Sequence, residues 1–85
     1  MASKRLLKKR IKNSTFRMLN ECDYVMENDS DSADAADKLM DELVDFYDAI
    51  MAKYGAAKTT QEIKAVSDEA EKSIQELESK VRGLE

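Results

Sequence analysis

The side chains best placed for chemistry are five aspartates that recur every three or four residues in the middle of the chain. On a helix this spacing sets all five along one side, where carboxylates could meet a basic surface or a divalent cation. Such neighbours repel one another weakly, so a solvated outer face is the simplest interpretation. The alternatives are a docking surface for a basic partner and the near side of the chain's own basic segment. This aspartate ridge consists of Asp34, Asp37, Asp41, Asp45 and Asp48.

The basic counterpart lies at the start of the chain, where residues 1–19 hold seven cations and no anion. Residues 20–50 hold eleven anions against Lys38 alone, although the net charge of the whole chain is only −4. A basic helix can bind nucleic acid or an anionic membrane surface, but no aromatic residues alternate with these cations, so base-specific recognition is not expected. The cations are Lys4, Arg5, Lys8, Lys9, Arg10, Lys12 and Arg17.

Pairing of this basic segment inside the fold is the favoured interpretation. In an up-down-up bundle the start of the first helix lies beside the end of the second and the start of the third. Exposed ion pairs contribute only about 0–1 kcal/mol each, so they would select topology more than stability. The expected acidic partners are Asp41, Glu42, Asp45, Asp48, Glu62, Asp68 and Glu69.

The residues on which most catalytic and metal sites depend are missing from the sequence. There is no histidine, which removes the usual general base and the commonest metal ligand. One cysteine cannot form an internal disulfide or a zinc site by itself, and two glycines do not make a phosphate-binding loop. We therefore predict a protein that is not an enzyme and that carries no cofactor or metal.

Two smaller features could suggest sites but have simpler explanations. Cys22 falls on the apolar face of the first predicted helix, where a free cysteine behaves as a small hydrophobe. The segment 29–34 resembles the start of a calcium loop, yet the EF-hand pattern would need glycine at Asp34 and glutamate at Met40. We interpret the cysteine as a core residue and the segment as a turn followed by a helix start.

A hydrophobic period near 3.6 residues predicts three helices, at about 3–27, 32–54 and 60–82. Asp31 is the expected N-cap of the second helix, and Thr59 that of the third, where Glu62 completes a capping box. Gly55 and Gly83 stand where left-handed residues would end the second and third helices. Acid–base pairs are expected along the third helix at Asp68–Lys72, Glu76–Lys80 and Glu78–Arg82.

Matched helix lengths and short loops predict an all-α, up-down-up three-helix bundle that forms a single domain over residues 1–85. A chain this short has room for one core and little room for a deep pocket. No apolar run approaches the ~18–20 residues of a membrane span, and no secretory signal is visible, so the expected location is the cytoplasm. The predicted core comprises Leu7, Ile11, Met18, Leu43, Tyr47, Ile50, Ile63, Ile74 and Leu77.

Apolar side chains on two sides of the first helix predict two partners for that helix. Leu6, Phe16 and Tyr24 lie outside its core-facing stripe, and exposed apolar patches tend to mark interfaces. We expect a homo-oligomer, most simply a twofold dimer with antiparallel first helices. The alternative is that Phe16 edges a wide core stripe and Tyr24 is a hydrated aromatic. The predicted function is association with itself or with a protein partner, with electrostatic nucleic-acid binding as the alternative.

The first half of the chain also carries a family resemblance. Its residues run in the order Leu7-Lys8-Lys9, Ile11, Phe16, Glu21-Cys22, then Ala36-Asp37-Lys38-Leu39-Met40 and Asp45-Phe46. This order resembles a group of small uncharacterised helical proteins of gut anaerobic bacteria, whereas the third helix departs from that group. The resemblance implies a short cytoplasmic helical bundle and implies no activity.

Overall fold

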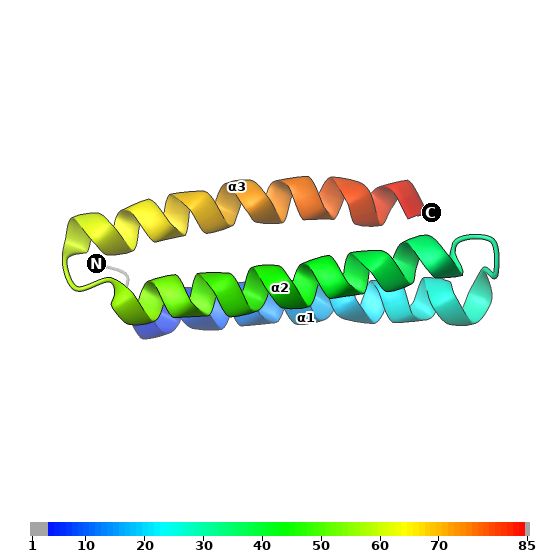
Figure 1. The fold of residues 1–85 in the computed structure, drawn as a ribbon, viewed down its shortest axis with the longest axis horizontal. Helices are drawn as coiled ribbons and strands as arrows, with labels where there is room; N and C mark the ends of the chain where they lie inside the picture. The colour runs from blue at the N-terminus through cyan, green and yellow to red at the C-terminus, as the bar shows by residue number, and fades with distance from the viewer. Residues whose placement is uncertain (1–3, 85) are drawn as a thin grey trace.

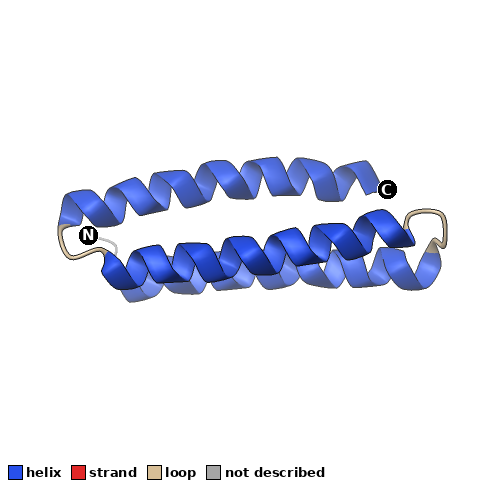
Figure 2. Cartoon of the chain, viewed as in Figure 1, coloured by secondary structure: helices blue, strands red, loops and turns tan. Residues whose placement is uncertain are grey.

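The protein is an up-down-up bundle of three helices of nearly equal length (Figure 1). The computed structural model describes residues 4–84, which form α1 (Lys4–Asn28), α2 (Ala33–Ala56) and α3 (Thr60–Leu84). Every pair of helices is in contact, and α1 and α2 share the most extensive interface. The result is a rod of 46 × 18 × 16 Å, all of its described secondary structure being helical (Figure 2). The predicted architecture is confirmed, and the helix bounds differ from the predicted ones by at most two residues; the predicted start at residue 3 lies outside the described residues.

Each helix buries most of the stripe that its periodicity predicts, but the buried side chains form two clusters instead of one core. The larger cluster lies toward the α1–α2 turn, and the smaller one toward the α2–α3 turn. Phe46 and Ile74 are half-buried and pack against both clusters, so they join them. The larger cluster contains Met18, Cys22, Val25, Ala36, Leu39, Leu43, Leu77 and Val81; the smaller contains Ile11, Ile50, Tyr54 and Ala70.

The predicted core residues all lie in or against these clusters. Ile11, Met18, Leu43, Ile50 and Leu77 are buried. The other four, Leu7, Tyr47, Ile63 and Ile74, are half-buried and line the edge of the clusters.

A short hydrogen-bond chain satisfies the polar tip of the largest fully buried side chain, Tyr54. The Ser67 hydroxyl donates its only hydrogen to the Ile63 carbonyl oxygen, 2.9 Å away. The Tyr54 hydroxyl therefore donates to Ser67 Oγ, also at 2.9 Å. Thr15, the buried polar residue of α1, is satisfied in the same way because its hydroxyl donates to the Ile11 carbonyl at 2.8 Å. The buried hydroxyls of Tyr54 and Thr15 are therefore both hydrogen-bonded, so neither leaves an unpaired polar group in the core.

The helix ends follow the sequence signals only in part. Thr59 caps α3 as predicted, accepting a hydrogen bond from the Glu62 N–H at 3.1 Å. The Glu62 carboxylate reaches back to the N–H of Lys58, one residue earlier than in the usual capping box. The predicted N-cap of α2 is wrong, because the helix begins after Ser32 and the Asp31 N–H instead donates to Asp29 Oδ1 at 3.1 Å.

Neither glycine ends its helix as predicted. Gly55 lies inside α2 and Gly83 inside α3, and no described residue has a positive φ. The α2 helix instead ends when Ala57 turns to an extended conformation, with φ −71° and ψ 126°. The Ala57 N–H still bonds the Lys53 carbonyl at 2.9 Å, so one more helical bond is kept beyond Ala56.

Candidate functional site

The three apolar residues predicted as an interface do not form one surface. Leu6, Phe16 and Tyr24 are 44%, 47% and 67% exposed. Leu6 and Tyr24 lie on the same side of α1, but their 18-residue separation corresponds to about 27 Å along the helix. Phe16 lies between them in sequence and is turned about 80° from both around the helix axis. Phe16 borders α2, because its ring packs beside Tyr47.

Phe16 is the centre of an apolar patch shared by α1 and α2. Its ring packs beside the half-buried ring of Tyr47, with centroids 6.1 Å apart and planes tilted by 35°. The Lys12 ammonium lies 5.6 Å from the Phe16 ring centroid, in cation–π range. Val44 precedes Tyr47 by one turn on the same side of α2 and is 47% exposed. We call Phe16, Val44 and Tyr47 the central patch, since they lie near the middle of the rod.

The central patch was only partly predicted. The helical period of α2 takes in both Val44 and Tyr47, although only Tyr47 belongs to the predicted core. A stripe wider than about 100° contains edge positions as well as core positions, and these two occupy its α1 edge. The converse error concerns Phe46, which packs against both core clusters although the predicted core does not include it. Its spacing from Leu39, Leu43 and Ile50 carries the missing signal.

The aspartate ridge runs along the solvent side of α2, and all five of its carboxylates are exposed. Asp41 and Asp48 stand one turn before and one turn after Val44, so the ridge borders the central patch. Within residues 4–84, no ion pair involves any residue of the ridge. This face of α2 therefore presents uncompensated negative charge to solvent.

The basic segment of α1 is not paired inside the bundle as predicted. Arg17 makes the one ion pair of this segment within the described residues, and its partner is Glu78 of α3, which was not among the expected acids. Lys4 donates to the Ala57 carbonyl at 3.0 Å, tying the start of α1 to the end of α2. No ion pair within residues 4–84 involves Arg5, Lys8, Lys9 or Lys12. Most of these cations face solvent, and the aspartate ridge of α2 also faces solvent, so the two sets of charges do not meet in the bundle.

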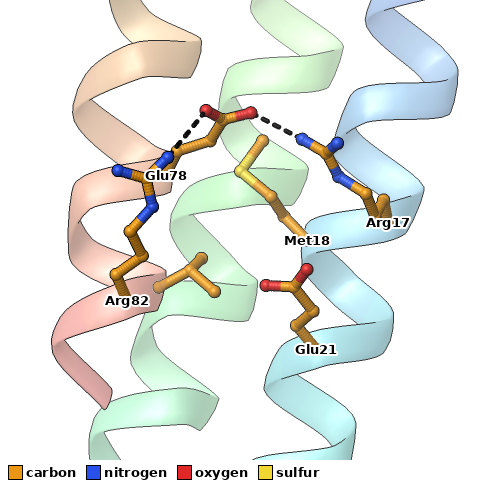
Figure 3. Close-up of a pocket in the computed structure, with 6 residues that line it drawn as sticks. Arg17, Met18, Glu21, Glu78 and Arg82 are labelled. Carbon is orange, nitrogen blue, oxygen red and sulfur yellow. Dashed lines mark hydrogen bonds and ion pairs between the residues drawn. The ribbon is translucent and has the colours of Figure 1, made fainter. Parts of the chain in front are cut away.

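Ion pairs of the described chain instead attach α3 to the other two helices. The Glu78 carboxylate stands between the guanidinium groups of Arg17 and Arg82, joining α1 to α3 across a hollow of about 230 Å³ (Figure 3). Glu78–Arg82 is thus the predicted i, i+4 pair, at 3.9 Å. Lys80 pairs with Glu42 of α2, at 3.1 Å, instead of the expected Glu76.

The remaining acid–base contacts differ from the expected set as well. Asp68–Lys72 does not form an ion pair in the described chain, whereas Lys53 of α2 pairs with Glu69 of α3. That contact does join two of the regions expected to meet, the end of α2 and the start of α3. All these pairs are partly exposed, so each contributes at most about 1 kcal/mol.

Two further features lie outside these surfaces, the thiol of Cys22 and a second hollow. Within residues 4–84, no group of three or more histidine, cysteine or acidic residues is arranged to hold a metal ion. Cys22 is fully buried, and burial raises the pKa of its thiol, with the negative charge of Glu21 adding to the effect. A second hollow, of about 350 Å³ between α1 and α3, is open to solvent and lined by a mixture of apolar and charged side chains. No helix in the described part of the chain has both the length and the apolarity needed to cross a membrane.

No protein-family model, curated protein or solved structure matches the chain. The resemblance to small helical proteins of gut anaerobic bacteria therefore stays a prediction. The interpretation of the surface rests on its own geometry: a central apolar patch, with unpaired charges on both sides of it.

Proposed function

We propose that the protein is a non-enzymatic binding module that associates with another protein chain, a second copy or a different protein, through the central patch of α1 and α2. The observation that carries the proposal is that two half-exposed apolar side chains, Phe16 of α1 and Val44 of α2, flank the Tyr47 ring near the middle of their helices. Contiguous exposed apolar surface on a small protein is characteristic of interfaces. The size of the chain supports this, since association buries surface that one short chain cannot bury by itself.

The proposal is tested by comparing two substitutions of exposed aromatic residues. Phe16→Glu places a charge in the central patch, whereas Tyr24→Glu places the same charge about 80° away on α1. Sedimentation gives self-association, and affinity capture from the native host gives other partners. We expect the wild-type protein and the Tyr24→Glu variant to bind a partner chain, and the Phe16→Glu variant to lose it. A wild-type monomer that retains no protein in a Phe16-dependent way would contradict the proposal.

A second candidate function is electrostatic binding of nucleic acid by the basic segment of α1. It is favoured by the exposed cations Arg5, Lys9 and Lys12, which make no ion pair within the described residues. Such binding releases counterions, so its affinity would fall steeply as salt rises. Titration of labelled duplex and single-stranded nucleic acid at low salt tests it, and no binding at tens of micromolar removes this candidate.

We place the proposed association in the cytoplasm. The support is the state of Cys22, a lone buried thiol, which is the ordinary form of cysteine in a reducing compartment. Localisation of a tagged chain in the native host tests this placement, and recovery from a secreted or membrane fraction would contradict it.

A further inference from the structure

One row of side chains along α1 is arranged symmetrically about Phe16. Phe16 is the middle residue of Lys4–Asn28, and intervals of four, three and four residues lead away from it in both directions. Intervals of three and four keep side chains on one side of a helix, and all seven positions of the row are exposed. We call this row the α1 stripe; it consists of Arg5, Lys9, Lys12, Phe16, Asn20, Asp23 and Glu27.

The sign of the charge reverses at the centre of the α1 stripe. The three positions before Phe16 are all basic, and the three after it are one amide and two acids. Consider a second copy of the helix that runs antiparallel to the first, with the twofold axis at Phe16. A residue that lies a given number of positions before Phe16 in one copy then faces the residue the same number of positions after Phe16 in the other copy. The facing pairs are then Lys12 with Asn20, Lys9 with Asp23, Arg5 with Glu27, and Phe16 with itself.

The charges on the whole rod follow the same division. The half formed by residues 4–16 and 45–72 holds ten cations and six anions, a net charge of +4. The half formed by residues 17–44 and 73–84 holds four cations and eleven anions, a net charge of −7. Two parallel copies would place like charges side by side, whereas two antiparallel copies place each basic half against an acidic one.

Few contacts within the chain compete for the α1 stripe. No ion pair within residues 4–84 involves Arg5, Lys9, Asp23 or Glu27. At the centre, Phe16 packs beside Tyr47 and lies within cation–π range of Lys12, and it is still 47% exposed. The alternation of three and four residues is also the spacing with which two helices pack along a coiled-coil seam.

From this self-complementarity we infer that the partner of the central patch is a second copy of the chain, packed antiparallel along the α1 stripe about a twofold axis at Phe16. The inference rests on the proposed function, because it names the occupant of the surface proposed there. A twofold axis needs a surface that complements itself, and the α1 stripe has that property at each of its positions. The apolar patches of the two copies then cover one another at the centre, between two sets of opposite charges.

The test begins with sedimentation of the full chain at low ionic strength, where we expect a species of twice the 9.6 kDa chain mass. Arg5→Glu with Lys9→Glu brings acids against acids at four places in the dimer, so we expect the Kd to rise about tenfold or more. The matched control is Lys64→Glu with Lys72→Glu, which makes the same charge change on exposed positions of α3, outside the α1 stripe, and should raise the Kd far less.

The antiparallel register is tested by restoring complementarity. A chain that carries Arg5→Glu, Lys9→Glu, Asp23→Lys and Glu27→Lys together has the charges of both opposite-charge pairs of the α1 stripe exchanged, while Lys12 still faces Asn20. Antiparallel pairing of two such chains again matches opposite charges, so the Kd should return toward the wild-type value. Parallel pairing would still face like charges, and failure of this chain to recover affinity would overturn the inference.

A disulfide test reports the register directly. Lys12→Cys and Asn20→Cys chains, mixed and oxidised mildly, should join to each other far more than either joins to itself. The native thiol of Cys22 is buried and does not compete. Equal cross-linking in the mixed and unmixed samples would overturn the antiparallel alignment.

A wild-type chain that stays monomeric at about 200 micromolar would overturn the inference, because its Kd would then be too high for an ordinary specific association. That result leaves the proposed function standing if a different protein is captured in a Phe16-dependent way. Loss of both the dimer and the captured protein would remove the proposed function together with the inference.

Discussion

Replacing Leu43 with alanine should be the most damaging of the conservative changes open to this chain. Leu43 has no exposed surface and belongs to the larger core cluster, where Met18, Leu39 and Leu77 also lie. The substitution removes buried carbon and leaves a cavity, which costs about 2–5 kcal/mol. An 85-residue domain has a total stability of about 4–13 kcal/mol, so this is a large share of it.

The matched control is the same substitution at Leu6, which is 44% exposed. Leu6→Ala should cost less than about 1 kcal/mol, because surface substitutions rarely exceed that. Urea unfolding followed by circular dichroism gives both free energies at one protein concentration. In thermal unfolding, Leu43→Ala should melt roughly 8–40 °C below the wild-type chain. Equal losses at the two positions would show that the central stripe of α2 does not form the core.

Three further outcomes follow from single contacts. Tyr54→Phe removes the hydroxyl that donates to Ser67 Oγ, so the free energy of unfolding should fall by about 1 kcal/mol in urea titration, while Ser67 keeps its bond to the Ile63 carbonyl. Thr59→Ala removes the cap of α3 and should cost about 0.5–2 kcal/mol by the same measurement; an unchanged midpoint would mean that the Glu62 N–H finds another acceptor. Burial raises the pKa of the Cys22 thiol, so the unfolded state loses this proton at lower pH than the folded state, and stability should fall as pH rises past the ordinary thiol value of 9.0. A Cys22→Ala chain should lack that part of the fall, and a native thiol that reacts with a disulfide reagent as fast as the unfolded one would contradict the burial.

The sequence predicts this fold well because its signals are local and repeated. Three helical periods, each sustained over more than twenty residues, leave few arrangements that bury every stripe. The same reasoning fails at single positions near a stripe edge, such as Val44. Two neighbouring positions around the helix at that edge can differ in whether their side chains are buried or exposed. Phe46 shows the opposite error, because an aromatic side chain at the other edge is long enough to reach both core clusters.

Helix ends and ion pairs are less predictable for a different reason. A glycine allows a left-handed conformation but does not require it, and Gly55 remains helical because the chain turns at Ala57 instead. Exposed lysines are long and have several acids in reach, so the pair that forms depends on helix positions that only the packed bundle defines. Lys80 therefore reaches Glu42 across the bundle in place of Glu76 on its own helix.

The division of the core into two clusters means that different parts of the rod need not open together. The smaller cluster, of Ile11, Ile50, Tyr54 and Ala70, lies in the half that carries the unpaired cations of α1, so its helices should separate locally at lower free energy than those of the larger cluster. Amide hydrogens near Ile11 and Ile50 would then exchange with solvent ahead of those near Cys22 and Leu43. A second chain bound along the length of α1 would contact both halves of the rod at once. It would therefore reduce the difference in amide exchange rate between the two clusters.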